Sequence, residues 1–362
     1  MAEFVAGLQL CRVFYTQAVR PLLDEAYPRL RHAAARVGPG SEVLGFDTAR
    51  SADHDWGPRL ELLLSPADAD RHGEQVSQLL ARRLPKQTLG WPTHFEPPDA
   101  RVRVMAHTDG PVAHRVVVTD TGRWSAALLG FDALNEPTTL DWLATPTQVL
   151  AEVTGGAVYH DGIGELTALR ARLAWYPDDV WRYVLACQWA RIGQEEPFTG
   201  RAGETGDETG SRIITARLAR DVMRLCLLLA RRWPPYSKWL GRAFGQLPQA
   251  AQIAAALRAA LTADQSAPRQ DALCAAYEAA GAWQNTLGLA EAVHARRRPF
   301  HDRPYAVIGA QRFADALTAR IADPQLARLG PAGAVDQFAD NTEVLMRPGT
   351  ARAAAAAVHG LR

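Results

Sequence analysis

Two aspartates that are separated by one residue stand just before a hydrophobic segment in the first third of the chain. Asp53 and Asp55 precede residues 59–65, RLELLLS, which the run of leucines predicts to be a strand. Side chains two positions apart on an extended segment project to the same side, where two carboxylates repel each other unless a cation lies between them. Such oxygen ligands suit a Mg²⁺ ion that also bridges substrate phosphates. We therefore predict that Asp53 and Asp55 hold magnesium.

A glycine-serine turn precedes this pair. Gly40 and Ser41 are followed after eleven residues by Asp53. The turn is expected to open a short helix, whose free backbone N–H groups and serine hydroxyl can hold a terminal phosphate. An Asp-x-Asp pair alone usually marks a solvated loop. Together with the turn and the following strand, it predicts a site for a nucleoside triphosphate, ATP being the expected one, with its magnesium ion.

The order Gly-Ser, a gap and Asp-x-Asp resembles the signature of the polymerase-beta-like nucleotidyltransferase superfamily. Further segments are similar to the bacterial family called domain of unknown function 4037, which is regarded as nucleotidyltransferase-like. This resemblance extends from about residue 30 to residue 345 and implies an N-terminal nucleotidyltransferase domain followed by an all-helical domain. The segments that carry it are GPGSEVLGFDTARSADHDWGPRLELLL, DWLATPTQVLAEVTGGAVYHD, GRAGETGDETGSR, PPYSKWLG, RPFHDRPYAV and GAVDQFADN.

The resemblance implies an enzyme that moves a nucleotidyl group, AMP being expected, from a nucleoside triphosphate to a hydroxyl of an unidentified acceptor, either a small molecule or a macromolecule. Members of the superfamily commonly place a third acidic residue on a neighbouring strand. In the matching segment, residues 114–121, Val117 stands where glutamate is expected, and Asp120 follows three residues later. We predict Asp120 as the third catalytic carboxylate, with Glu61 as the other candidate. The alternative is a nucleotide-binding or regulatory protein that has lost turnover.

Two basic residues of the second half, Lys238 and Arg212, are candidates for nucleotide binding. Lys86 and Lys238 are the only lysines among 40 basic residues, so a lysine that is kept can reflect a need for a compact ammonium group. Lys238 is expected to contact the triphosphate, and the plain alternative is a surface lysine. Arg212 ends a glycine-rich, acidic segment, residues 200–212, which we expect to be an exposed, mobile loop. Such a loop either closes over the nucleotide with Arg212 on a phosphate or has no such role.

The rest of the pattern predicts an α+β protein with two domains. The first, residues 1–140, is expected to be a nucleotidyltransferase-type mixed sheet with helices, among them helices within residues 1–37. The second, residues 141–362, is expected to be a helical bundle, because its apolar residues recur at intervals of three and four.

A hairpin is expected within the first domain. Residues 101–108 and 114–121 both have the composition of strands. The sequence Asp109-Gly110-Pro111 between them is typical of a tight turn. We therefore predict that these two strands pair with each other.

Charge and composition limit the possible partners. The 40 basic and 39 acidic residues leave a formal charge of +1, so no overall field attracts nucleic acid, which we do not expect as a partner. No apolar run approaches the ~20 residues that span a bilayer, so no membrane association is expected. The first residues lack the basic region and cleavage site of a signal peptide, which predicts a cytoplasmic protein. The four cysteines lie in apolar segments and are expected to be buried thiols.

Overall fold

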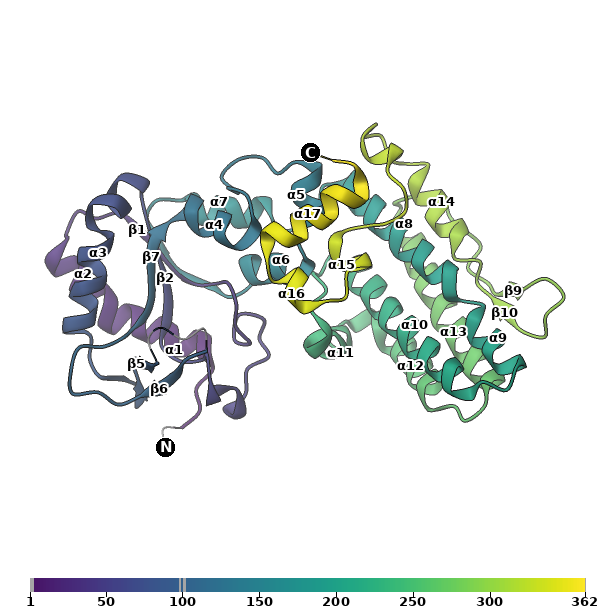
Figure 1. The fold of residues 1–362 in the computed structure, drawn as a ribbon, viewed down its shortest axis with the longest axis horizontal. Helices are drawn as coiled ribbons and strands as arrows, with labels where there is room; N and C mark the ends of the chain where they lie inside the picture. The colour runs from purple at the N-terminus through teal and green to yellow at the C-terminus, as the bar shows by residue number, and fades with distance from the viewer. Residues whose placement is uncertain (1–2, 98, 100–101, 362) are drawn as a thin grey trace. The chain divides into compact units, whose positions relative to one another are not determined.

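In the computed structural model, which describes residues 3–97, 99 and 102–361, four strands form one mixed sheet (Figure 1). The order across this sheet is β7 (Arg115–Asp120), β2 (Arg59–Leu64), β1 (His32–Arg36) and β8 (Ala157–Asp161). Strand β1 is antiparallel to both of its neighbours, whereas β2 and β7 are parallel. The sheet, its helices and the helical second half confirm the α+β class.

The leucines of β2 form the centre of the first hydrophobic core. Leu60, Leu62 and Leu64 are fully buried in a cluster with Val116 of β7 and Val76 of helix α3 (Pro66–Arg83). Burial of each leucine contributes roughly 1.5–3 kcal/mol. Because side chains alternate along a strand, the other residues of β2 belong to the opposite face of the sheet, and the candidate site is built there.

The predicted hairpin is wrong. Strand β6 (Val104–Ala106) pairs with β5 (His94–Glu96) instead, and β7 pairs with β2. The reason is that the valines of β7 join the leucines of β2 in one core, and this burial outweighs the turn signal between the two segments. Arg101, the first residue of the predicted strand, lies outside the described residues.

The chain divides into two units. Unit 1 consists of Met1–Pro137 and Val149–Ala174, and unit 2 of Thr138–Gln148 and Trp175–Arg362. The chain therefore passes between the two units three times. The further elements of unit 1 are α1 (Gly7–Phe14), the π-helical turn Tyr15–Val19, α2 (Arg20–Ala26), the 3₁₀ turn Ala49–Asp53, β3 (Gln87–Thr88), β4 (Trp91–Pro92), α4 (Thr121–Leu129) and α7 (Glu165–Arg172), and α6 (Thr147–Thr154) spans both units.

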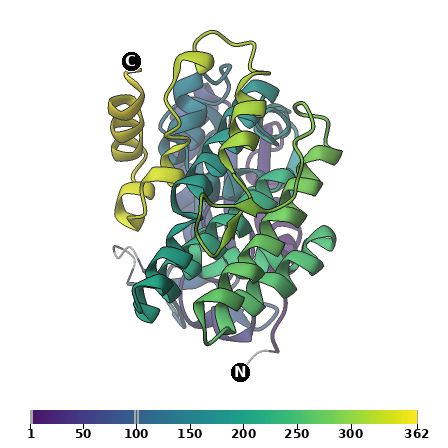
Figure 2. The same cartoon turned by 90° about the vertical axis from the view of Figure 1, so that its right-hand side faces the viewer.

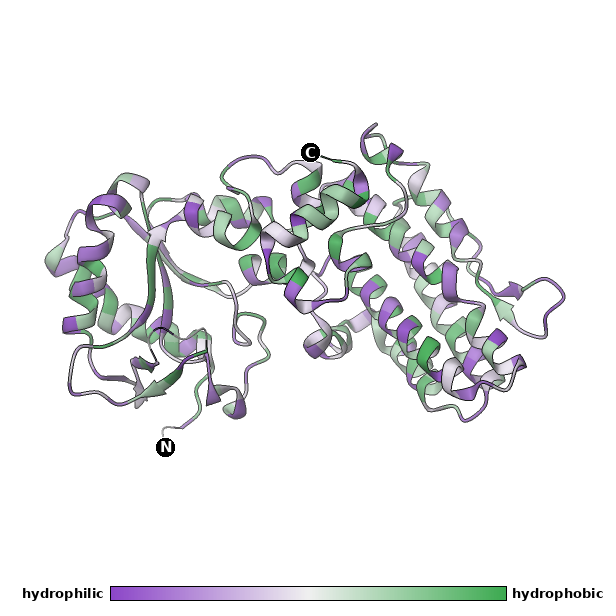
Figure 3. Ribbon diagram, viewed as in Figure 1, coloured by the Kyte–Doolittle hydropathy of each residue, from purple (hydrophilic) through white to green (hydrophobic). Residues whose placement is uncertain are grey.

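Helices are the main elements of unit 2, and α10 packs against both α8 and α13 (Figure 1, Figure 2). Figure 3 shows both hydrophobic and hydrophilic residues along these helices, and α8 is buried on all sides over residues 183–190. The elements of this unit are α5 (Thr139–Ala144), α8 (Asp178–Glu195), α9 (Phe198–Glu204), α10 (Glu208–Leu229), α11 (Ser237–Gly245), α12 (Ala251–Thr262), α13 (Ser266–Thr286), the short strands β9 (Arg298–Pro299) and β10 (Ala306–Val307), α14 (Gln311–Thr318), α15 (Val335–Phe338), α16 (Thr342–Leu345) and α17 (Pro348–His359), with 3₁₀ turns at Pro248–Ala250 and Leu326–Arg328.

The glycine-rich segment 200–212 is not the long loop that its composition predicts. It contains the end of α9, a short turn and the start of α10. Asp207 caps α10, because its Oδ1 accepts a hydrogen bond from the backbone N–H of Gly210 at 2.8 Å. The buried Ser211 hydroxyl donates to the carbonyl of Thr199 at 3.1 Å, which ties the two helices together. Small residues here allow close helix packing rather than a flexible chain.

Two further expectations concern the whole chain. All four cysteines are buried free thiols, as predicted. Among the described residues, no helix combines the length and apolar character needed to cross a bilayer.

Candidate functional site

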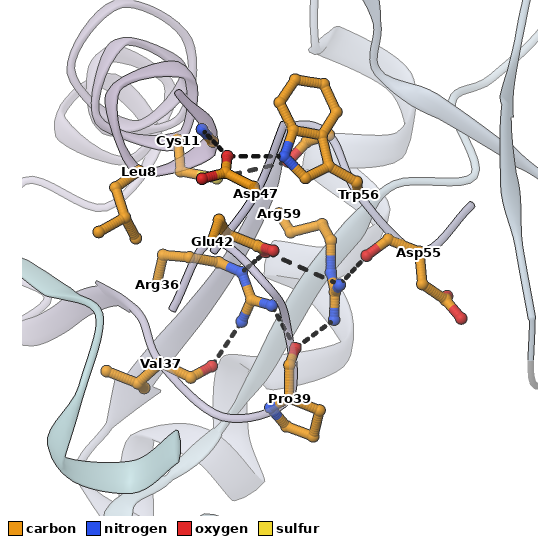
Figure 4. A network of polar contacts seen from close by, with 12 residues as sticks. Leu8, Cys11, Arg36, Val37, Pro39, Glu42, Asp47, Asp55, Trp56 and Arg59 are labelled. Carbon is orange, nitrogen blue, oxygen red and sulfur yellow. Dashed lines mark hydrogen bonds and ion pairs between the residues drawn. The ribbon is translucent and has the colours of Figure 1, made fainter. Parts of the chain in front are cut away.

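A fully buried arginine at the end of β1 forms hydrogen bonds with the segment around the glycine-serine turn. Arg36 donates from Nε to Oε1 of Glu42 at 2.8 Å, and its other nitrogens donate to the carbonyls of Val37 and Pro39 (Figure 4). A Cβ atom at Gly40 would lie 2.7 Å from the Glu42 carboxylate oxygens, so this close approach requires glycine. The turn that the sequence singles out is thus a rigid part of unit 1, although residues 41–45 form turns and not the predicted short helix.

A second buried arginine connects the two ends of the loop between β1 and β2. Arg59 donates to the carbonyl of Pro39 at 3.3 Å and to the carbonyl of Asp55 (Figure 4). Burial, and next the charge of Arg36, lower the pKa of Arg59 to about 10, so its guanidinium is still charged at neutral pH. The Glu42 carboxylate lies 3.9 Å from it and balances this charge. The same guanidinium therefore brings the Gly-Ser turn close to Asp55.

Neither aspartate of the Asp-x-Asp pair lies on a strand, which corrects the predicted geometry. Strand β2 begins at Arg59, and Asp53 ends the 3₁₀ turn. Asp55 has a left-handed backbone with φ of 46°, and its Oδ1 lies 2.8 Å from Nη1 of Arg115. The Oδ1 of Asp53 lies 2.8 Å from the imidazole of His54. The alternation of strand side chains therefore does not position these two carboxylates.

A magnesium ion at this pair would need ligands beyond the two carboxylates. The described residues contain no group of three or more His, Cys, Asp or Glu side chains that could hold a metal. Magnesium commonly takes only one or two carboxylates when substrate phosphates and water complete its shell. The side chains of Asp53 and Asp55 are 62% and 33% exposed, so both are open to such a ligand.

Asp120 is not brought to the Asp-x-Asp pair. It ends β7, whereas Arg115, the partner of Asp55, begins that strand, and five residues of strand span roughly 17 Å. Asp120 is buried and caps α4, accepting a hydrogen bond from the backbone N–H of Arg123 at 2.9 Å. Its place in the fold is explained by this cap.

Glu61, the other candidate for the third carboxylate, bonds to Arg36 and to the start of the loop after β1. Glu61 is buried, and its Oε2 accepts a hydrogen bond from the backbone N–H of Val37 at 3.1 Å while Oε1 lies 3.3 Å from Arg36 Nη1. Burial raises the pKa of Glu61, and the charge of Arg36 opposes that shift. Its partner across the parallel strands is Val117, whose side chain is 49% exposed. The open position on this face is thus apolar.

The two basic candidates lie in unit 2. Lys238 is exposed in the first turn of α11, with Nζ 4.9 Å from the centre of the Trp239 ring. Arg212 is exposed on α10, and its Nη2 donates to the carbonyl of Asp264 at 3.2 Å. These contacts suit surface residues, and the roles in nucleotide binding stay predictions from the sequence.

The residues that organise the loop were not among the candidates found from the sequence. Arg36, Glu42, Arg59 and Arg115 connect the turn, the sheet and Asp55. One available signal was a charged residue at the end of an alanine-rich strand, and another was a glutamate directly after the Gly-Ser turn. A buried charge needs a partner of opposite sign, so such residues in apolar surroundings indicate an internal ion pair.

Comparisons with known proteins address the family and the fold. Residues 142–240, which are 99 of the 362 residues, match the model of the family described as domain of unknown function (DUF4037). The resemblance inferred from the motifs is thereby confirmed for this segment. No curated protein matches the chain. A solved structure, that of a nucleotidyltransferase-like protein from Exiguobacterium sibiricum 255-15, aligns with 84% of this chain and 88% of that chain, at 12% identity and a TM-score of 0.32.

Proposed function

We propose that unit 1 binds a nucleoside triphosphate as its magnesium complex at the loop between β1 and β2. The observation that carries this proposal is the guanidinium of Arg59, which bonds to the carbonyls of both Pro39 and Asp55. It links the Gly-Ser turn to the Asp-x-Asp pair before any ligand arrives. A polar loop that is ordered in advance loses less entropy when it binds a ligand.

Each part of the loop has a proposed role. The backbone N–H groups and hydroxyl of the Gly40-Ser41 turn bind the terminal phosphates. Asp53 and Asp55 hold the magnesium ion, which neutralises phosphate charge when bound. Arg115, now paired with Asp55 at 2.8 Å, is a further cation within reach of that charge.

Binding without transfer is proposed in preference to nucleotidyl transfer. Transfer to a hydroxyl requires a base that removes its proton. Glu61 is buried and hydrogen-bonded, Asp120 caps α4, and Val117 has no ionisable group. None of these three positions supplies a free carboxylate beside Asp55. The transfer of AMP that the sequence predicts is therefore the second candidate, and its acceptor is not identified by these residues.

Calorimetric titration of Mg-ATP into the full chain tests the proposal. We expect binding by the wild type and a loss of at least about tenfold in affinity for Asp53→Asn/Asp55→Asn, because neutral amides are poorer ligands for magnesium. Asp24→Asn, which removes an exposed carboxylate from α2, is the matched control and should bind as the wild type does. The absence of binding by the wild type, or equal affinities of both variants, would refute the proposal.

A pyrophosphate assay on the same samples separates the two candidates. If the chain binds without transfer, no pyrophosphate forms above the level of the double variant. Release that requires both magnesium and the two aspartates would instead establish cleavage between the α- and β-phosphates, which is the bond that nucleotidyl transfer breaks and that binding alone leaves intact.

A further inference from the structure

A small recess in unit 2 is lined by three arginines. Arg191 comes from α8, Arg220 and Arg224 come from successive turns of α10, and residues 336–340 form the rest of the wall. The recess has a volume of about 220 Å³ with its open mouth included. Much of this volume is open solvent, so the enclosed part of the recess admits only a small group.

The three guanidinium groups are unequally paired with acidic residues. Nε of Arg191 lies 3.1 Å from both carboxylate oxygens of the buried Asp221. Nη1 of Arg220 lies 2.6 Å from Oδ2 of Asp340. Among the described residues Arg224 forms no ion pair, and it donates instead to the backbone carbonyl of Asp336.

The carboxylate of Asp336 is already engaged elsewhere. It accepts hydrogen bonds from the backbone N–H of Thr147, at 3.0 Å, and from the hydroxyl of the same residue. Both of these donors belong to unit 2. Arg224 is thus the guanidinium in the recess whose charge is least balanced by a direct partner.

Two donors in the wall have no acceptor. The Nε atoms of Arg220 and Arg224 are buried, and neither has a hydrogen-bond partner in the described part of the chain. A buried N–H group without a partner is unfavourable, and native proteins rarely leave one. An acceptor reaches these two buried N–H groups only when the arginine side chains reorient, and beside three arginines that acceptor would be an anion.

Asp340 marks the position of such an anion. Its side chain is 74% exposed, so burial does not force it into the recess. The hydrogen bond from Arg220 lowers the pKa of Asp340, and the charges of Arg220, Arg224 and Arg191 lower it further. All three arginines therefore act on this one carboxylate at the mouth.

We propose that the recess is a binding site for a phosphate group, which takes the place of the Asp340 carboxylate. A ligand with a single carboxylate would gain little over Asp340, which is tethered beside the arginines at a high effective concentration. A phosphate dianion carries more charge and more acceptor oxygens, which suit the forked donors of arginine. This proposal uses residues of unit 2 alone and does not depend on nucleotide binding by unit 1.

Titration of inorganic phosphate into the full chain at low ionic strength tests the site. We expect the wild type to bind phosphate and Arg224→Gln to bind at least about tenfold more weakly. Arg217→Gln is the matched control, because Arg217 lies on the same helix but pairs with Glu195, 2.6 Å away, outside the recess. This control should bind phosphate within about twofold of the wild type.

A second variant keeps the test decisive if Arg224→Gln does not fold. Asp340→Asn removes an exposed carboxylate, so the protein should fold normally and bind phosphate several-fold more tightly, because the competing charge is gone. Weaker binding by Asp340→Asn, equal binding by Arg224→Gln and the wild type, or an equal loss in Arg217→Gln would each overturn the proposal.

The identity of the anion is tested with three probes. Acetate that binds as tightly as inorganic phosphate would overturn the exchange with Asp340. Binding of glycerol 3-phosphate at the strength of inorganic phosphate would assign the site to a phosphoryl group at the end of a larger molecule. Binding of inorganic phosphate alone would assign it to the free anion.

Discussion

Glu61 and Val117 occupy paired positions on neighbouring strands, yet their surroundings are opposite in character. The carboxylate of Glu61 is buried and hydrogen-bonded to β1 and its loop, which prevents it from acting as a free base. Val117 is open to solvent but carries no group that could remove a proton. At the scale of single residues, this contrast is the reason for proposing binding ahead of transfer.

Val117→Glu should create part of the missing site. Position 117 lies on the same face as Arg115, two residues away, and Arg115 contacts Asp55. Because Val117 is exposed, we expect the free energy of unfolding to change by less than about 0.5–1 kcal/mol. A third carboxylate should tighten magnesium binding in the nucleotide complex by about tenfold, equivalent to about 1.4 kcal/mol. Magnesium titrations in the presence of ATP measure this, and equal affinities for Val117→Glu and the uncharged control Val117→Gln would contradict it.

Gly40→Ala should destabilise the loop. The added Cβ would lie 2.7 Å from the Glu42 carboxylate and collide with the buried ion pair to Arg36. We expect the free energy of unfolding to fall by about 1–3 kcal/mol, as for other overpacked sites. Denaturant unfolding measures the change, with Gly241→Ala as the control. Gly241 lies on the exposed side of α11 with open space around it, so alanine there should raise stability by up to about 1 kcal/mol.

At the scale of elements, α17 is attached to α5 by a small apolar cluster and one ion pair. Ala351 and Ala355 of α17 are fully buried against Leu140 of α5. Arg352 donates to the carboxylate of Asp141, which is 7% exposed. Burial acts to raise the pKa of Asp141, but hydrogen bonds from Thr138 and Arg352 outweigh it, and the pKa lies below its ordinary value of 3.8.

Arg352→Ala should therefore loosen α17. It leaves a buried carboxylate without its cation. We expect amide exchange in α17 to accelerate about tenfold, which corresponds to a fall of about 1.4 kcal/mol in the free energy of local opening. Arg347→Ala, which removes an exposed pair with Glu343, should have little effect. Because folding lowers the pKa of Asp141, its contribution to stability is present above pH 3.8 and is lost as the pH falls through the lower folded-state value. Unchanged exchange in Arg352→Ala would show that the alanines alone hold the helix.

Local patterns predict most individual elements, and they fail where distant contacts decide. The leucines of 59–65 predict β2, and the intervals of three and four predict helices such as α10. The turn at residues 109–111 predicts a hairpin, yet β7 pairs with β2 because the two strands share a core. The glycines in 200–212 predict a loop. The hydrogen bond between Ser211 and Thr199 instead ties two helices together there, and the local sequence does not reveal that bond. The same holds for the site. The sequence pattern identifies Gly40 and Asp55 as candidates, but it does not indicate that Arg59 connects the two segments.

At the scale of the whole chain, unit 2 is assembled from segments that are far apart in the sequence. Thr147 bonds to Asp336, 189 residues later, and this contact places residues 138–148 with the C-terminal half. No local pattern carries that information, which is why a single boundary near residue 140 is the simplest expectation from sequence alone. The two proposed sites, in contrast, are each built within one unit, so their ligands can be tested separately on the intact chain.

Hydrogen exchange of the full chain with each ligand should distinguish the two sites. A ligand at a hundred times its Kd stabilises the bound form by about 2.7 kcal/mol, which slows exchange through local opening by up to about a hundredfold. Mg-ATP should protect residues 39–55 of unit 1, and inorganic phosphate should protect residues 336–340 and the amides of α10 around Arg224. Asp53→Asn/Asp55→Asn should abolish the first effect and retain the second, whereas Arg224→Gln should do the reverse. Loss of both effects in either variant would show general destabilisation instead of two independent sites, because neither substitution removes a ligand-binding group from the other unit.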